Sequence, residues 1–296
     1  MTTPASSSDQ FAPVPDGRYL DVDGVRTFYI DRGEGDVIVL LHGSSLGIDG
    51  YITWFRTIEH LSARFRVISF DQIGFGRTDV PEDGQYLNRL ERLEHASRFL
   101  QLLGVEHATI VGHSEGGFMA TYLALENPEL VTRLVVVTSG GVSPTLGGSA
   151  DNEWMEASNS AYDYAGQSMT EDHFIATSAY LKRAEDPSYE AVLRENFRLA
   201  QTSGQTPMML NLPAEETDPR LYVSLQEKHV LPRLAELHLP VLLIWASDDP
   251  TVPVARGAKL MELIPQADMH VFNRAGHMVM HDRAEDFATL LAKWCR

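Results

Sequence analysis

The sequence predicts an α/β protein with a doubly wound, mostly parallel eight-stranded sheet and an inserted helical cap. Short apolar runs such as Val37 to Leu41 alternate with longer amphipathic segments up to residue 140. This alternation is typical of parallel strands joined by helices. It stops after residue 140 and resumes near residue 230. We therefore expect a disordered tail of residues 1–17, a core of residues 18–140 and 230–296, and a helical cap of residues 141–229.

The expected elements follow one another along the chain. Asp23-Gly24 separates two strand patterns, Tyr19 to Val22 and Val25 to Ile30, and predicts a hairpin. Apolar residues recur at helical spacing from Leu90 to Leu103, so Leu90, Leu93, Ala96, Leu100 and Leu103 are expected to face the core, and Gly104 to end the helix. Further strands are expected at 37–41, 65–70, 109–111, 134–137, 241–245 and 269–272, core helices at 54–61, 117–126, 254–264 and 284–294, and cap helices at 154–165, 171–184, 188–202 and 219–229.

Composition excludes several classes of function. The net charge of −17 over 296 residues argues against nucleic-acid partners and against an anionic membrane surface. Cys295 is the only cysteine, so neither a disulfide framework nor a thiolate metal site is expected. The polar N-terminus has no apolar signal segment, and no apolar run approaches membrane-spanning length. We expect a soluble cytoplasmic protein that is a monomer or a homodimer.

The stretch from Thr109 to Met119 predicts a sharp turn between a strand and a helix, with a serine at its apex. A β-branched run ends at Gly112, and an apolar helical pattern begins two residues after Ser114. A nucleophile elbow needs small residues around its serine because larger side chains would collide in the strained turn. Gly116 and Gly117 complete this requirement.

A serine hydroxyl needs a base to accept its proton, and a histidine base needs a carboxylate to orient it. His277 stands between the last expected strand and the last expected helix. Asp248 and Asp249 both follow the strand at 241–245. We favour Asp249 because it lies further round the turn, and we assign Asp248 to capping that turn. The predicted triad is therefore Ser114, Asp249 and His277.

Two backbone N–H groups are needed where negative charge develops on the substrate carbonyl. One belongs to Glu115, the residue after the nucleophile, and the other is best supplied by Ser44 in the loop after residues 37–41. That loop repeats the elbow pattern around Ser45, but no helix follows at once, so it fits the oxyanion role instead. The Ser45 hydroxyl is a candidate substrate contact. We expect the Glu115 side chain to turn away and anchor a nearby loop.

Neither a cofactor nor a metal is expected. His277 and His281 have helical spacing, but no metal-binding motif surrounds them. Aromatic residues and methionines of the cap predict a small or medium apolar acyl or diketone substrate. Candidate pocket residues are Tyr162, Tyr164, Phe174, Tyr180, Met208, Met209 and Leu210, together with Met278.

His42-Gly43, Asp71 to Gly76, the elbow, Asp249 and His277 together resemble the α/β-hydrolase superfamily, whose triad has the same chain order. The spacing of 28 residues from Asp249 to His277, with the start of the insert at Ser139-Gly140-Gly141, is similar to that of the meta-cleavage product hydrolases. Those enzymes break carbon–carbon bonds in vinylogous diketo acids.

The chain departs from that subfamily at three places. Its members usually carry Asn where this chain has His113, and Trp where it has Met278. Their lid arginine, which binds the substrate carboxylate, falls near Thr177, with Lys182 and Arg183 as the cations that could replace it. The leading expectation is therefore hydrolysis of a carboxylic ester through an acyl-enzyme. Carbon–carbon hydrolysis of a vinylogous diketone is the alternative, followed by a non-hydrolytic lyase or a ligand receptor on the same fold.

Overall fold

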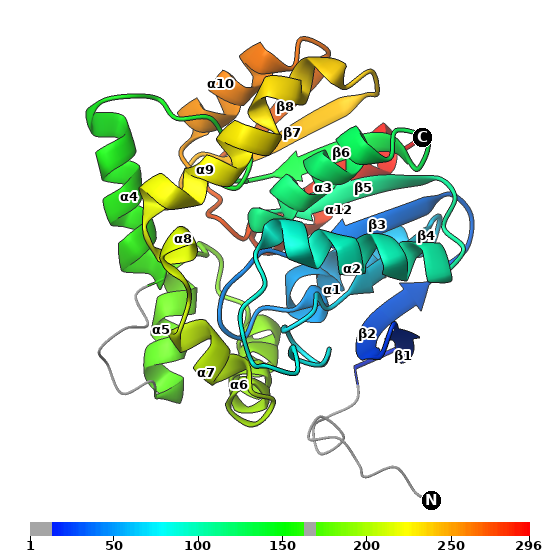
Figure 1. Cartoon of the computed structure of the whole chain (residues 1–296). Coiled ribbons are helices and arrows are strands. Elements are labelled where there is room, and N and C mark those ends of the chain that lie inside the picture. Colours follow the sequence, from blue (N-terminus) through cyan, green and yellow to red (C-terminus); the bar gives the residue numbers. More distant parts are fainter. Residues whose placement is uncertain (1–13, 163–169) are drawn as a thin grey trace, which may run out of the picture.

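The computed structural model describes residues 14–162 and 170–296. Eight strands of the described chain form one sheet in the order β1-β2-β4-β3-β5-β6-β7-β8 (Figure 1). β2 is antiparallel to both its neighbours, and the remaining neighbours are parallel. The expected eight-stranded, mostly parallel sheet is confirmed. The strands are β1 (Gly17–Val22), β2 (Val25–Arg32), β3 (Val37–Leu41), β4 (Arg66–Phe70), β5 (Ala108–His113), β6 (Val131–Val137), β7 (Val241–Ala246) and β8 (Ala267–Phe272).

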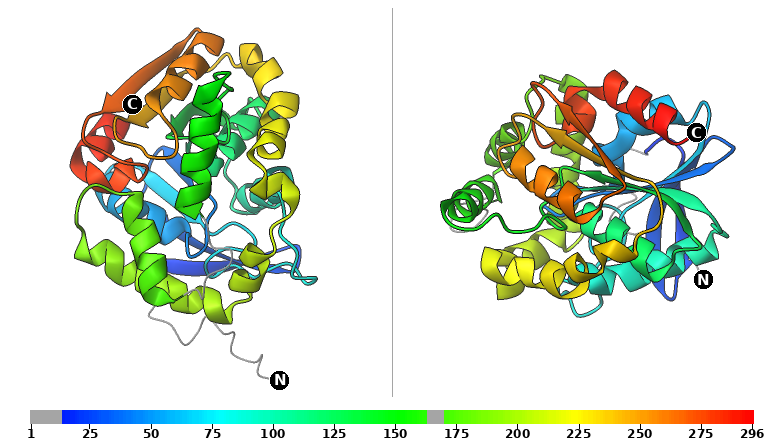
Figure 2. Two further views of the ribbon diagram at one scale, coloured as in Figure 1. Left: turned by 90° about the vertical axis from the view of Figure 1, so that its left-hand side faces the viewer. Right: turned by 90° about the horizontal axis from the view of Figure 1, so that it is seen from above.

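Helices cover both faces of the sheet (Figure 2). In β3, Ile38 and Leu40 pack into the cluster that contains Trp54, whereas Val39 and Leu41 pack into the cluster that contains Phe118. Successive strand residues point to opposite faces, so α1 and α12 cover one face, and α2, α3 and α10 cover the other. The core helices are α1 (Gly50–Leu61), α2 (Arg89–Leu102), α3 (Glu115–Glu126), α10 (Val254–Leu263), α11 (Val279–Asp282) and α12 (Ala284–Trp294).

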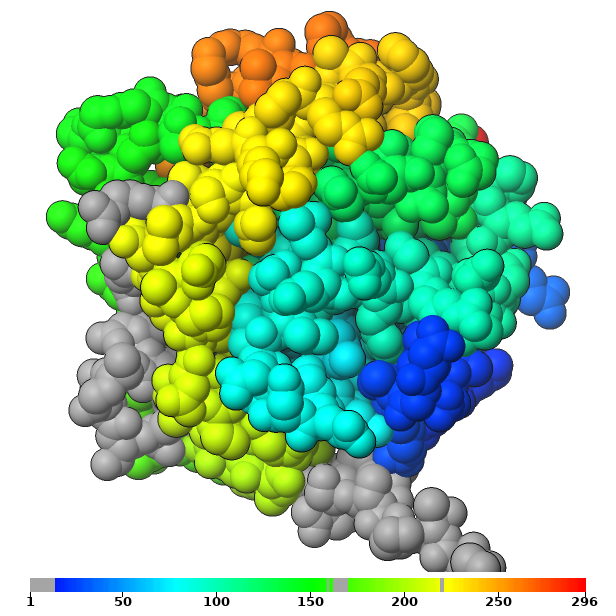
Figure 3. Space-filling view, viewed as in Figure 1, coloured from blue at the N-terminus to red at the C-terminus, as the bar shows by residue number. Residues whose placement is uncertain are grey.

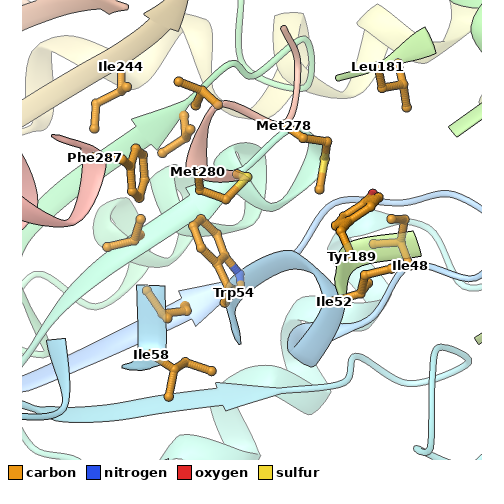
Figure 4. Close-up of a cluster of buried hydrophobic side chains, with 14 of the residues drawn as sticks. Ile48, Ile52, Trp54, Ile58, Leu181, Tyr189, Ile244, Met278, Met280 and Phe287 are labelled. Atoms are coloured by element: carbon orange, nitrogen blue, oxygen red, sulfur yellow. The ribbon is translucent and has the colours of Figure 1, made fainter. Parts of the chain in front are cut away.

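The first of these clusters joins the core to the cap (Figure 4). Trp54 and Phe287 form its centre, with ring centroids 6.3 Å apart. Met278, which follows the candidate histidine, is buried in the same cluster, as are Leu181 and Tyr189 of the insertion. Burial of these side chains on one another therefore anchors the insertion beside the loop that follows β8.

The chain between β6 and β7 forms the helical insertion that the sequence predicts. It lies over the carboxyl edge of the sheet. There Gln226 Nε2 of the insertion donates to the carbonyls of Gly140 (3.2 Å) and Ser143 (2.6 Å), in the loop that follows β6. In Figure 3 its atoms pack closely against the chain around α2. The elements are α4 (Ser149–Tyr162), α5 (Glu171–Tyr180), α6 (Pro187–Thr202), α7 (Gln205–Leu210), α8 (Ala214–Thr217), α9 (Pro219–His229) and η2 (Leu231–Glu236).

The buried face of α2 is wider than the expected apolar stripe. Arg89 and Arg92 are fully buried, whereas Leu90 and Leu103 are only partly buried. The two guanidinium groups are tolerated inside because they find carbonyl, amide and carboxylate acceptors and aromatic faces there. The expected stripe is confirmed, since Leu93, Ala96 and Leu100 are buried and Leu90 and Leu103 pack against the same cluster. The burial of the two arginines was not expected, because tertiary partners outweighed side-chain hydropathy there.

The folded region also begins earlier than expected. Val14 is buried and Gly17 opens β1, so residues 14–17 are not part of a tail. Residues 163–165 of the first expected cap helix lie outside the described residues, as does the candidate pocket residue Tyr164. The short helices α7 and α8 were not expected, because neither is long enough to show a periodic pattern.

Candidate active site

Ser114 lies at the turn between β5 and α3 with a backbone conformation of φ 54° and ψ −123°. A positive φ is costly for a residue with a side chain. The neighbouring glycines make the turn possible. A Cβ on Gly112 would lie 2.1 Å from the Gly116 carbonyl oxygen, and one on Gly116 would lie 2.5 Å from that of Leu41. The geometry is that of a nucleophile elbow.

The second copy of the elbow pattern lies against the first. Gly43 follows β3, and a Cβ placed on it would lie 2.8 Å from Ser114 Cβ and 3.3 Å from Ser114 Oγ. No helix begins until Gly50. The loop that carries Ser44 therefore passes beside the Ser114 hydroxyl and cannot itself form an elbow.

His277 and Asp249 meet in the structure. The Nδ1 atom of His277 lies 2.8 Å from Asp249 Oδ2, and both side chains are buried. The other carboxylate oxygen accepts from Thr251 N (2.8 Å), Thr251 Oγ1 (3.0 Å) and Val252 N (2.9 Å). Asp249 thus orients the imidazole and caps its own turn.

The prediction that the Asp248 side chain caps the turn after β7 was wrong. Asp248 accepts instead from the neighbouring Ser247 hydroxyl at 2.7 Å. Thr251, which sequence reasoning missed, also lies 3.2 Å from His277 Nδ1. Thr251 follows Asp249 by two residues, which is the spacing of an Asx-type turn. That spacing could have predicted its contact with Asp249.

This arrangement places the proton on Nδ1 of His277, because a carboxylate accepts there. The Nε2 atom then carries the lone pair that a general base needs. Nε2 is buried and has no hydrogen-bond partner among the described residues, so Ser114 Oγ is not hydrogen bonded to it. Catalytic hydrogen bonds are often long before substrate binds.

The backbone of His277 is held by two side chains from the elbow side of the site. Its carbonyl oxygen lies 3.1 Å from His113 Nε2 and 3.1 Å from Thr138 Oγ1. The rings of His113 and His277 have centroids 4.7 Å apart. Burial, reinforced by repulsion from His277, keeps the pKa of His113 well below its usual range, so His113 is neutral.

The Glu115 side chain turns toward α2. It forms a buried ion pair with Arg92, and the Tyr86 hydroxyl donates to its carboxylate at 3.5 Å. The Glu115 N–H lies in the first turn of α3, where backbone donors have no partner within the helix. Neither Arg92 nor Tyr86 was predicted to lie here; a helical arginine ordinarily faces solvent.

The other candidate contacts lie in different surroundings. Ser45, Met208, Met209 and Met278 are buried, whereas Ser44 is partly exposed and bonds the Tyr86 hydroxyl at 3.0 Å. Tyr180 and Leu210 are about half exposed, and their expected contact with the substrate stays a prediction. Phe174 is fully buried and packs against Phe197 within the insertion, with ring centroids 5.1 Å apart and the rings tilted by 34°.

The two candidate carboxylate-binding cations are both engaged. Lys182 Nζ donates to the Ala184 carbonyl at 2.9 Å and lies 4.6 Å from the centre of the Tyr189 ring. Arg183 donates to the carbonyl of Asp248 at 2.6 Å. Both cationic groups therefore make hydrogen bonds to backbone carbonyls within the protein.

A cavity of about 490 Å³ lies between α7 and the loop before α2. Met208 and Tyr86 line it together with Val80, Gly84, Gln85, Gly204, Pro207 and Asn211.

Over residues 14–162 and 170–296 no cluster of histidine, cysteine and acidic side chains is arranged to hold a metal ion. Within the same residues no helix has the length and apolar character needed to cross a membrane.

Residues 36–284 match the model of a family described as the alpha/beta hydrolase fold. The chain belongs to the α/β-hydrolase family. It is similar to the 2-hydroxymuconate semialdehyde hydrolase of Pseudomonas sp. (strain CF600), with 30% identity over 93% of this chain and 92% of that protein. The enzyme of the same name from Pseudomonas putida is 31% identical over 93% of this chain and 92% of its own length.

Solved structures support the same placement of this α/β-hydrolase. A mutant of the meta-cleavage product hydrolase CumD superposes with a TM-score of 0.78 at 27% identity, covering 94% of this chain and 97% of that one. A structure described as an N-acyl homoserine lactone degrading enzyme superposes with a TM-score of 0.66 at 26% identity, covering 93% of this chain and 98% of that one. The expected resemblance to meta-cleavage product hydrolases is confirmed.

Proposed function

We propose that this hydrolase cleaves a carbon–carbon bond in a vinylogous 2-hydroxy-6-oxo dienoate. The observation that carries the proposal is similarity over nearly the whole chain to relatives whose names describe hydrolysis of such compounds, among them a 2-hydroxy-6-oxo-2,4-heptadienoate hydrolase of Pseudomonas putida at 28% identity. Ester hydrolysis, the leading expectation from the sequence, therefore becomes the second candidate.

The geometry suits this chemistry. Ser114 Oγ attacks the keto carbon while His277 Nε2 takes its proton, and Asp249 stabilises the imidazolium. For this step the dienoate reacts as its keto tautomer, in which the proton of the 2-hydroxyl group has moved to the carbon beside the 6-oxo group. The carbon–carbon bond then breaks, and its electron pair is delocalised from that carbon through the double bond onto the 2-oxo group. His277 returns the proton to that carbon. Water, activated by His277, adds to the acyl-enzyme and releases the carboxylic acid and Ser114. The N–H groups of Ser44 and Glu115 would hold the oxyanion.

Ester or lactone hydrolysis remains the second candidate for a specific reason. His113 and Met278 stand where the carbon–carbon hydrolases usually carry Asn and Trp. The cations near Thr177, Lys182 and Arg183, donate to backbone carbonyls of the protein. The structural similarity to the lactone-degrading enzyme points the same way. Both reactions share the acyl-enzyme and differ only in the leaving group.

A substrate panel separates the two candidates. We expect 2-hydroxy-6-oxohepta-2,4-dienoate to give a kcat/KM at least about 10²-fold above those of p-nitrophenyl acetate and an N-acyl homoserine lactone, corresponding to roughly 2.7 kcal/mol of extra transition-state stabilisation. Ser114→Ala should abolish turnover of all three and labelling by a fluorophosphonate. An ester or lactone that outpaces the dienoate would contradict the proposal. Labelling that survives Ser114→Ala would contradict the nucleophile.

A further inference from the structure

Arg92 is a buried cation for which the triad has no direct use. Its side chain has no exposed surface, and it lies in the N-terminal part of α2, where the helix dipole disfavours a positive charge. Burial of an arginine is costly unless its donors are satisfied. Such a residue is stable only because specific partners surround it.

The partners of Arg92 connect it to both segments whose backbone N–H groups would bind an oxyanion. Arg92 pairs with Glu115, the residue that follows Ser114. It also donates to the Tyr86 hydroxyl at 3.1 Å, and Tyr86 bonds the Ser44 hydroxyl at 3.0 Å. One guanidinium group therefore contacts the Glu115 side chain directly and the loop of Ser44 through a single hydroxyl.

A second chain of hydrogen bonds joins Arg92 to the same loop, through Gln72. Arg92 Nη1 donates to Gln72 Oε1 at 2.6 Å, and Gln72 Nε2 donates to the carbonyl of His42 at 2.6 Å. The backbone N–H of Gln72 also donates to His42 Nε2 at 3.0 Å. The loop after β3 is thus held at His42 and at Ser44, the two residues that flank Gly43.

The charges around Arg92 define its electrostatic role. Burial raises the pKa of Tyr86 to about 12 and lowers that of His42 to about 3, so both groups are neutral near pH 7. Glu216 of α8 acts on Arg92 through space, and burial raises the pKa of its carboxyl group. Among the described residues, the carboxylate with which Arg92 forms an ion pair is that of Glu115. Without Arg92 that charge would stand uncompensated one residue from the nucleophile.

We propose that Arg92 is a positioning residue that aligns the backbone donors of Ser44 and Glu115 and neutralises the Glu115 carboxylate beside the developing oxyanion. The inference rests on the proposed function only in requiring an oxyanion formed at Ser114. A carboxylic ester and a vinylogous diketone both meet that requirement.

The test compares variants on p-nitrophenyl acetate, whose hydrolysis does not depend on the identity of the natural substrate. We expect Arg92→Gln to lower kcat about 10- to 100-fold with KM changed by less than about threefold, since loss of one oxyanion donor alone costs about 10²–10³. Tyr86→Phe removes only the hydroxyl that joins Arg92 to Ser44 and should lower kcat by a smaller factor, about threefold to tenfold.

The decisive measurement is restoration of kcat by a second substitution. Adding Glu115→Gln to Arg92→Gln removes the uncompensated charge and should recover about tenfold in kcat. If Arg92 acted only on the stability of the fold, kcat measured well below the Tm of each variant would not fall in Arg92→Gln. A double variant no faster than Arg92→Gln would overturn the proposal.

Arg256 provides a matched control for the burial of an arginine. It is also fully buried, is paired with Asp151 and lies 3.9 Å from the centre of the Trp154 ring. We expect Arg256→Gln to lower Tm as much as Arg92→Gln while kcat changes by less than about threefold. Equal losses of kcat in both variants would also overturn the proposal. A wild-type protein that cleaves the ester but not the dienoate would contradict the proposed function while leaving this comparison valid.

Discussion

Ser114 combines the reacting hydroxyl with a backbone that is unfavourable for any residue with a Cβ. Its φ of 54° costs on the order of 1–3 kcal/mol, which the packing around β5 and α3 must offset. The Ser114 N–H donates to the Val137 carbonyl at 2.9 Å, and the Ser114 carbonyl accepts from Gly117 N at 3.0 Å. These hydrogen bonds therefore hold the Ser114 backbone in the strained conformation that positions its hydroxyl.

This strain predicts a difference between two inactive variants. Ser114→Gly should unfold at a higher temperature than Ser114→Ala, because glycine adopts a positive φ without the Cβ clash. We expect the glycine variant to be about 1–2 kcal/mol more stable, measured by urea unfolding and thermal scans of both proteins. Equal stabilities would show that the turn is not strained at this residue.

At the scale of elements, one carboxylate connects the insertion with the histidine loop. Asp282 of α11 accepts from the backbone N–H groups of Arg183 (2.9 Å) and Ala184 (2.8 Å), which lie in the insertion after α5. It also accepts from Gly276 N at 2.7 Å, one residue before His277. The Met278 N–H donates to the Leu181 carbonyl at 3.2 Å. The position of the histidine loop thus depends on contact with the insertion.

We expect Asp282→Ala to lower the free energy of unfolding by about 1–3 kcal/mol, because three backbone donors lose their acceptor. kcat/KM should fall as well, since His277 loses a fixed position. Asp286→Ala is the control, because Asp286 pairs with Arg283 at the surface and such pairs contribute about 0–1 kcal/mol. The prediction fails if kcat/KM of the two variants is the same.

At the scale of the whole molecule, the buried histidines make the free energy of unfolding depend on pH. Burial lowers the pKa of both His42 and His281 to about 3, and lowers that of His113 well below its usual range. Between pH 6.5 and about 3 the unfolded chain binds protons that the folded chain does not. The stability from these neutral histidines is fully present above pH 6.5 and is lost as the pH falls below it.

His281 offers the cleanest test of this pH dependence, because its Nε2 donates to the Ile52 carbonyl at 2.8 Å and a glutamine can reach the same acceptor. Between pH 6 and pH 4.5, His281→Gln should reduce the slope of unfolding free energy against pH by up to about 1.4 kcal/mol per pH unit. His60→Gln, at an exposed position, is the control variant. An unchanged slope in His281→Gln would mean that His281 is protonated in the folded protein.

The sequence by itself determined the fold class and the elements that carry the candidate site. Hydrophobic periodicity and turn residues are local signals, so β3 (Val37–Leu41), the hairpin at Asp23-Gly24 and the elbow around Ser114 were predicted at or near their observed bounds. Chain order and turn position also sufficed to choose Asp249 over Asp248 as the partner of His277.

Only the tertiary structure decided how charge is arranged behind the nucleophile. Arg92 and Glu115 are 23 residues apart in the chain, and each would ordinarily be assigned to a solvated surface. They meet because α2 packs against α3 on one face of the sheet, which buries Arg92 beside Glu115. Side-chain contacts between distant segments depend on packing geometry, and no local pattern encodes that geometry.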